Sequence, residues 1–90
     1  MSEPIDEATE SFLRSAADDL QRQIGRAGVV RTVALEPADE GEKILASIAV
    51  GTRTVEMRGS GDTLVVAYAD LYRATAEGLL AALFTELVGA

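Results

Sequence analysis

The stretch VVRTVALEPADEGEKILASIAVGTRTVEMRGSGDTLVVAY, residues 29–68, decides the fold. It contains four short runs rich in β-branched and aliphatic residues, separated by segments with the Gly, Pro and Asp typical of turns. Because connections this short join antiparallel neighbours, we predict a four-stranded antiparallel meander in the order 1-2-3-4. The predicted strands are Val29–Glu36, Lys43–Val50, Arg53–Arg58 and Thr63–Tyr68, joined by loops at Pro37–Gly41, Gly51–Thr52 and Gly59–Asp62.

A helix is predicted on each side of this stretch. The first has Ser2 as its N-cap, Pro4 in its first turn and Gly25 or Gly28 at its end. At 100° per residue its apolar side chains fall on one stripe, as expected of an amphipathic helix. The second is predicted over Leu71–Val88, with Asp70 as its N-cap. The members of the first stripe are Ile5, Phe12, Leu13, Ala16, Ala17, Leu20, Ile24 and Ala27.

The predicted fold class is α+β: one domain over residues 1–90, with both helices on one face of the sheet in the order α-β-β-β-β-α. Alternation along the strands assigns one set of side chains to the helix-covered face, because successive residues of a strand point to opposite sides. That set is Val33, Leu35, Ile44, Ile48, Val50, Val55, Met57, Leu64, Val66 and Tyr68.

The other sheet face is predicted to be an interface. Its residues are small and apolar, whereas a fully solvated face is normally polar. We expect Leu45 and Val65 to cluster there beside Ala49 and Ala67, and to be buried against a second copy. The alternative is a tolerated mixed face, since scattered surface apolar residues are normal. The face comprises Val30, Thr32, Ala34, Leu45, Ser47, Ala49, Thr54, Val65 and Ala67, with Glu36, Lys43, Glu56 and Arg58 around them.

The predicted closing helix has two apolar sides. The broad side holds Tyr72, Ala76, Leu79, Leu80, Leu83 and Leu87. The narrow side is a ridge of small residues four apart, at Ala74, Gly78 and Ala82, which lets another helix approach closely. The ridge packs either on the first helix of the same chain or on a partner subunit.

Composition excludes several kinds of chemistry. The 90 residues include no Cys and no His, so disulfides, thiolate or imidazole metal sites and Ser/His/Asp catalysis are ruled out. The acidic cluster at Glu36, Asp39, Glu40 and Glu42 matches no calcium loop and is expected to be solvated. We therefore expect no enzyme activity, no metal and no cofactor.

The formal charge of −7 bears on partners and location. It disfavours strong nucleic-acid binding and attraction to an anionic membrane. Neither a signal peptide nor a membrane-spanning run is visible, so the protein is expected in the cytoplasm.

The segment Thr63-Leu-Val-Val-Ala-Tyr-Ala-Asp-Leu-Tyr-Arg-Ala-Thr-Ala-Glu-Gly-Leu-Leu80 resembles the end of the smallest, dimerising subunit of the KEOPS complex, which modifies tRNA. The likeness covers about a quarter of the chain. The chain departs from that family in the spacing of Asp70 and Arg73, in lacking a strand before the first helix, and in carrying an additional hairpin. The resemblance implies an accessory subunit of a nucleic-acid-associated complex. In outline, the predicted fold is also similar to small acidic type III secretion chaperones.

The favoured function is a non-catalytic protein-interaction module, either a homodimer or a small subunit of a larger assembly. Its predicted interface combines residues of the open sheet face with the small-residue ridge of the closing helix. The first alternative is the nucleic-acid-associated subunit, which would need a basic stripe of Arg31, Arg53, Arg58 and Arg73. The second is a small acidic chaperone-like protein. The third is an enzyme using only Asp, Glu, Arg, Ser, Thr or Tyr, which a deep pocket holding two carboxylates with raised pKa values would favour. The interface residues are Val30, Ala34, Leu45, Ala49, Val65, Ala67, Ala74, Gly78 and Ala82.

Overall fold

The structure is a computed structural model. It describes the backbone of residues 7–88 and the side chains of residues 7–81. This part of the chain forms two long helices and three strands. The predicted N-cap Ser2, Pro4, Ile5 and the side chain of Ala82 lie outside these limits. The elements follow one another as α1 (Glu7–Ile24), a 3₁₀ turn η1 (Gly25–Ala27), β1 (Val29–Glu36), β2 (Glu42–Val50), β3 (Arg53–Gly61) and α2 (Leu64–Val88).

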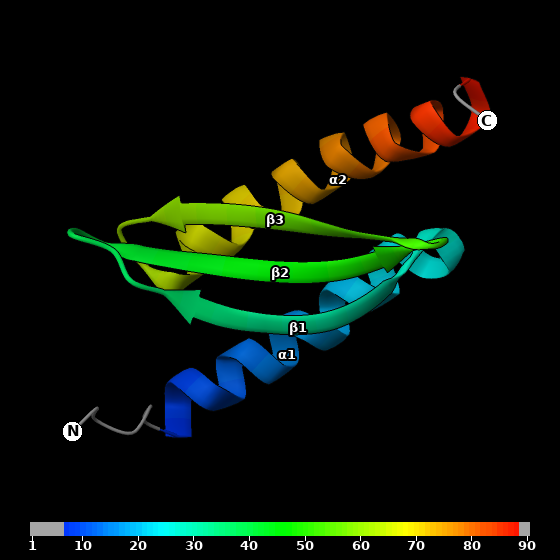
Figure 1. Ribbon diagram of the computed structural model, residues 1–90. Coiled ribbons are helices and arrows are strands. Elements are labelled where there is room, and N and C mark those ends of the chain that lie inside the picture. The colour runs from blue at the N-terminus through cyan, green and yellow to red at the C-terminus, as the bar shows by residue number, and fades with distance from the viewer. Residues whose placement is uncertain (1–6, 89–90) are drawn as a thin grey trace.

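The strands form one antiparallel sheet in the order β1-β2-β3. Both helices lie against the same face of this sheet, and the opposite face is left open by the described residues (Figure 1). The predicted α+β class and the two helices on one face are therefore confirmed. The prediction of a fourth strand is wrong.

Residues 64–68, placed in that fourth strand, begin α2 instead. Thr63 caps the helix: its Oγ1 accepts a hydrogen bond from Val66 N at 3.2 Å, and its carbonyl oxygen accepts one from Ala67 N at 2.9 Å. Asp70, the predicted N-cap, lies inside the helix and accepts a hydrogen bond from Ser60 N at 3.0 Å. The β-branched pair Val65–Val66 favours a strand locally, but the cap and the packing against β3 outweigh that preference.

Glycines of β3 explain this packing. The sequence predicts Gly59 and Gly61 in a hairpin loop, but in the structure both belong to β3. A Cβ on Gly59 would stand 2.6 Å from the Leu71 Cα, and one on Gly61 would stand 2.8 Å from Ala67 N. Because neither glycine has a side chain, the backbone of α2 can lie directly on β3 at these two positions. Any other residue there would place its Cβ too close to α2.

The core lies between the helices and the central strand β2. Alternate residues of β2, from Ile44 to Val50, are buried against the helices, as strand alternation predicts. Leu13, Ala16 and Leu20 of α1 pack on this face, together with residues of α2. The predicted inward residues Ile44, Ile48, Val50 and Met57 are buried, and Val33, Leu35, Val55, Leu64 and Tyr68 pack around them. Val66, predicted in the same set, is 50% exposed on α2, because it lies in a helix and not in a strand.

A β-bulge in β1 corrects the placement of Val30. Val30 pairs with Ile48 but Thr32 pairs with Ser47, so Arg31 is an additional residue in the register. Val30 therefore shares the helix-covered face with Ile48 and packs against the core. Val29, opposite Ala49, takes its place on the open face.

The side chain of Gln21 makes hydrogen bonds that connect the end of α1 to the following turn and to β1. Its Nε2 donates hydrogen bonds to the carbonyl oxygens of Gly25 (3.3 Å) and Gly28 (3.0 Å), and its Oε1 accepts one from Val30 N at 2.7 Å. Gly25 has a φ of 56°, the left-handed conformation common after a helix. The prediction that Gly25 or Gly28 ends the first helix is confirmed.

Candidate protein-interaction site

The open sheet face is more polar than the sequence suggested. Register places Thr32, Ala34, Leu45, Ser47, Ala49 and Thr54 on it, as predicted. Arg58 crosses this face: its Nε donates to Glu36 Oε1 at 2.9 Å, and its Nη2 lies 3.7 Å from Glu56 Oε1. Leu45 lies in register between Ala34 and Arg58 and is already partly buried. Paired charges over small side chains are typical of a solvated mixed face.

Two residues predicted for that face belong to α2. Val65 lies in the first turn of the helix and is 67% exposed, while Ala67 is fully buried. The expected cluster of Leu45 with Val65 and Ala67 is therefore not formed. Its loss removes the two residues that were predicted to join Leu45 and Ala49 in an apolar patch.

The small-residue ridge of α2 packs within the chain. A Cβ on Gly78 would stand 2.6 Å from the Met57 sulfur, so the bare side of Gly78 accommodates Met57 of β3. Ala74 is partly buried. Gly78 thus contacts Met57 of the sheet and not α1, while the predicted packing of the ridge on a partner subunit stays a prediction.

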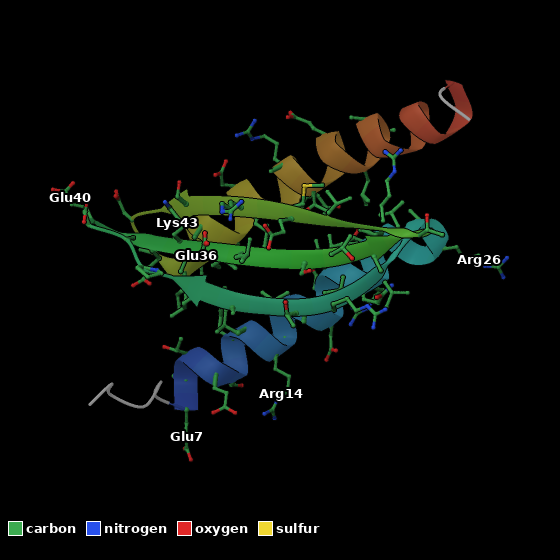
Figure 2. The ribbon with its side chains drawn as sticks, in the orientation of Figure 1. Glu7, Arg14, Arg26, Glu36, Glu40 and Lys43 are labelled. Carbon is green, nitrogen blue, oxygen red and sulfur yellow. The ribbon has the colours of Figure 1, made fainter. Side chains whose placement is uncertain are left out.

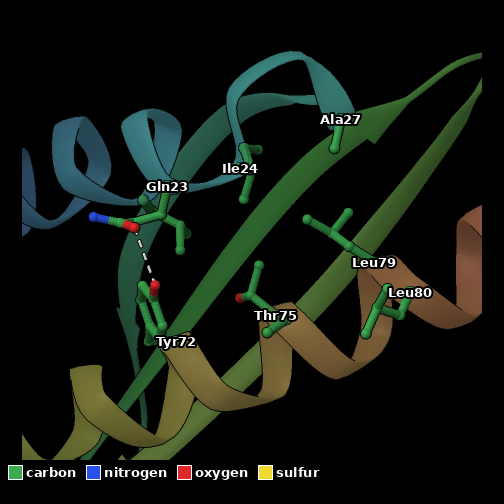
Figure 3. A pocket seen from close by; sticks show the side chains of 9 residues that line it. Gln23, Ile24, Ala27, Tyr72, Thr75, Leu79 and Leu80 are labelled. Atoms are coloured by element: carbon green, nitrogen blue, oxygen red, sulfur yellow. Dashed lines mark hydrogen bonds between the residues drawn. The ribbon is translucent and has the colours of Figure 1, made fainter.

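A groove opens between the C-terminal half of α1 and the middle of α2 (Figure 3). Its volume is about 220 Å³. Leu20, Ile24 and Ala27 line one wall, and Leu79 and Leu80 belong to the other. Gln23, Tyr72, Thr75 and Ala76 complete the lining. The groove is therefore mainly apolar, with a few uncharged polar groups.

Aromatic side chains join the helices on one side of this groove. The Tyr72 hydroxyl donates to Gln23 Oε1 at 3.0 Å, as Figure 3 shows, and the Tyr68 hydroxyl donates to Asp19 Oδ2. Tyr68 meets both Phe12 and Tyr72 edge-on, with ring centroids 6.3 and 6.5 Å apart. Burial, and the carboxylate of Asp19 next to it, raise the pKa of the Tyr68 hydroxyl well above its usual range. Tyr68 remains a neutral donor that holds α2 to α1.

One polar group in the groove wall has no partner. Thr75 is 1% exposed, and its Oγ1 makes no hydrogen bond within the described part of the chain. Figure 3 shows this hydroxyl on the side of the groove that faces Tyr72. A buried hydroxyl without a partner is destabilising, so the site is not fully satisfied in the single chain.

α2 continues beyond the sheet as an apolar helix. Figure 1 shows its last turns passing the edge of β3. Leu80, on the rim of the groove, is 69% exposed. From Leu79 to Val88 the sequence has only two polar residues, Thr85 and Glu86. A helix that is apolar on all sides is normally buried, so this end of α2 is the strongest sign of a missing partner.

The lining of the groove bears on the alternative of an enzyme that uses carboxylates. No carboxylate lines it, and among the described residues no group of three or more potential metal ligands occurs. At Asp70, hydrogen bonds from Ser60 N and Arg73 lower the pKa of the carboxyl, the opposite of what a general acid needs.

The proposed basic stripe is not formed. Arg58 lies on the open sheet face, while Arg73 lies on α2, on the other side of the sheet, and pairs with Asp70 (2.7 Å) and Glu77 (3.5 Å). No described helix is long and apolar enough to cross a membrane.

Neither a protein-family model nor a curated protein matches the sequence, and no solved structure matches the fold. The groove itself was missed at the sequence level. The available signal was the broad apolar side of the closing helix, which already grouped Tyr72, Leu79 and Leu80.

Proposed function

We propose that this protein is a non-catalytic interaction module that forms a homodimer through its helix layer, by way of the groove and the apolar end of α2. The single observation that carries the proposal is Leu80, 69% exposed on the groove rim, where α2 leaves its own sheet. Burying a leucine side chain contributes about 1.5–3 kcal/mol, so a partner at this position gains substantially.

The low charge of the last turns of α2 supports a second copy as that partner. The chain carries −7 overall, and two like-charged copies repel over most of their surface. From Gly78 to Val88 the only charged residue is Glu86. Two copies related by a two-fold axis, each presenting the same face, can therefore meet along this part of α2 with little repulsion.

The size of a stable interface can be compared with the length of α2. A stable interface buries about 800 Å² on each partner, from about 20 residues a side. α2 has 25 residues and, at about 1.5 Å each, is about 37 Å long. One side of α2 packs on its own sheet as far as Leu79, so the surface for a second copy comes from Leu80, the following turns of α2 and the groove residues of α1.

The native mass of matched variants tests the proposal. At tens of micromolar, sedimentation should give the wild-type protein twice the 9.5 kDa chain mass, and Leu80→Glu should give the monomer mass. Val65→Glu is the control: it puts the same charge on an equally exposed apolar position of the same helix, 67% against 69%, but away from the groove. It should remain dimeric.

Leu45→Glu separates the two surfaces on which a dimer could form. If the helix layer is the interface, this change on the open sheet face leaves the dimer intact. A wild-type monomer at tens of micromolar contradicts the proposal, and so does a dimer that Leu45→Glu dissociates while Leu80→Glu does not.

A further inference from the structure

Four of the seven arginines gather at one end of the molecule. Arg22 lies in the last turn of α1, Arg26 in η1, Arg31 at the bulge of β1, and Arg53 at the first position of β3. The register brings these elements together, because Val29 pairs with Ala49 and Val50 pairs with Arg53. We refer to this group as the arginine end.

The opposite end of the sheet is acidic. Figure 2 shows Glu40 and Arg26 at opposite extremes of the molecule. The acidic residues there lie at the end of β1, in the loop after it, at the start of β2 and after β3, with Lys43 among them. They are Glu36, Asp39, Glu40, Glu42 and Asp62. Acidic residues thus predominate at one end of the sheet and arginines at the other, although Lys43 and Arg58 lie among the acidic residues.

Three of the four cations of the arginine end lack a carboxylate partner in the described part of the chain. Within the described residues, Arg22, Arg26 and Arg31 form no ion pair, although Asp18 precedes Arg22 by one helical turn. Away from this end, Arg14, Arg58 and Arg73 each pair with a carboxylate. Cations near a helix C-terminus are stabilised by the helix dipole, which accounts for Arg22 and Arg26 but not for Arg31.

A hollow of about 790 Å³ opens at this end of the molecule, and two of the four arginines, Arg26 and Arg31, line it. Gly25, Gly28 and Gly51 also line it, so much of its floor is backbone. Gly28 must stay bare, since a Cβ there would stand 2.7 Å from the Ala49 carbonyl oxygen. The carbonyls of Gly25 and Gly28 would repel an anion, but both already accept hydrogen bonds from Gln21 Nε2.

We propose that the arginine end binds an acidic peptide segment of a partner protein. Guanidinium groups pair with carboxylates through two parallel hydrogen bonds, and the open hollow between α1, β1 and the β2–β3 turn suits an extended chain carrying several carboxylates. No aromatic residue lines the hollow, so nucleic-acid bases find nothing on which to stack, and the acidic remainder of the molecule repels a long polyanion.

A labelled hexaglutamate peptide is the probe, with binding to the full chain followed by fluorescence anisotropy at low salt. Arg26→Gln and Arg31→Gln should each weaken binding about tenfold, as expected for a lost charge-assisted hydrogen bond. Arg14→Gln is the control: it removes one exposed positive charge from the N-terminal half of α1, away from the hollow, and should leave affinity within about twofold. All three positions are exposed, so the variants should keep the wild-type circular dichroism spectrum.

Several outcomes overturn the proposal: no binding of the peptide at low salt, equal loss in Arg14→Gln and Arg31→Gln, or tighter binding of single-stranded oligo-dT than of the peptide. The proposal does not rest on the homodimer. The Leu80→Glu variant should bind the peptide as the wild type does, so failure of the dimer and failure of the arginine end are distinguishable.

Discussion

Gly59 of β3 lies directly beneath Leu71 of α2, where a Cβ atom added to the glycine would stand 2.6 Å from the Leu71 Cα. The contact is between two backbones, so neither side can move a flexible side chain away. This close approach fixes the start of α2 on the strand that precedes it.

Gly59→Ala should therefore lower the free energy of unfolding by about 3 kcal/mol, at the upper end of the usual range for overpacking. Urea denaturation followed by circular dichroism measures the change. Ser60→Ala, at the exposed neighbouring position, should stay within about 0.5 kcal/mol of the wild type. An equally stable Gly59→Ala variant would mean that α2 does not lie on β3 in this way.

Gln21 is expected to stabilise the fold more than any other polar side chain of α1, because it makes two hydrogen bonds to the turn after the helix and one to Val30 of β1. Gln21→Ala should lower stability by about 1–3 kcal/mol, since Val30 N and two carbonyls lose their partners. Gln21→Glu keeps an acceptor for Val30 N but repels the two carbonyls, so it should also be destabilising. Thermal unfolding of both variants checks this, and unchanged midpoints would contradict it.

Asp70 should make stability depend on pH in the acidic range. Its hydrogen bonds to Ser60 N and Arg73 lower the pKa of the carboxyl in the folded state below the ordinary 3.8. The unfolded chain then takes up the proton first, so this stabilisation is complete above pH 3.8 and is lost as the pH falls through the folded-state pKa. Unfolding midpoints of wild type and Asp70→Asn should differ near neutral pH and converge on acidification. A constant difference would show that the Asp70 charge does not stabilise the fold.

Thr75→Val should raise stability by about 1 kcal/mol, because it replaces a buried, unpartnered hydroxyl with a methyl group of similar size. The measurement must be made at a concentration where the protein is monomeric, so that a partner does not supply the missing hydrogen bond. A marked loss of stability would show that the hydroxyl is bonded within the single chain.

Strand alternation was enough to predict the inner face of β2. Ile44, Ile48 and Val50 are buried there because the period of a strand is fixed by geometry. The same reasoning misplaced Val30, because a bulge at Arg31 shifts the register and local sequence gives no sign of it.

The start of α2 could not be predicted from local preference. Val65 and Val66 favour a strand, and Gly59 and Gly61 look like a turn between strands. Their actual role is tertiary: the glycines leave space for the backbone of a helix, and Thr63 caps that helix. The groove depends on how closely the two helices approach each other, and the apolar stripes that placed Ile24 on one helix and Leu79 and Leu80 on the other do not give that spacing. The charge separation was visible only once the register had placed Arg31 and Arg53 at one end.

The chain contains no Cys, so a single introduced thiol reports on one position alone. The most direct test of the proposed dimer is the rate at which a maleimide reagent modifies the thiol of a Leu80→Cys variant as the protein concentration rises. If two copies meet along the helix layer, that rate falls with concentration, while the thiol of a Val65→Cys variant stays equally reactive throughout. A Leu80→Cys thiol that reacts at one constant rate up to tens of micromolar would contradict the homodimer.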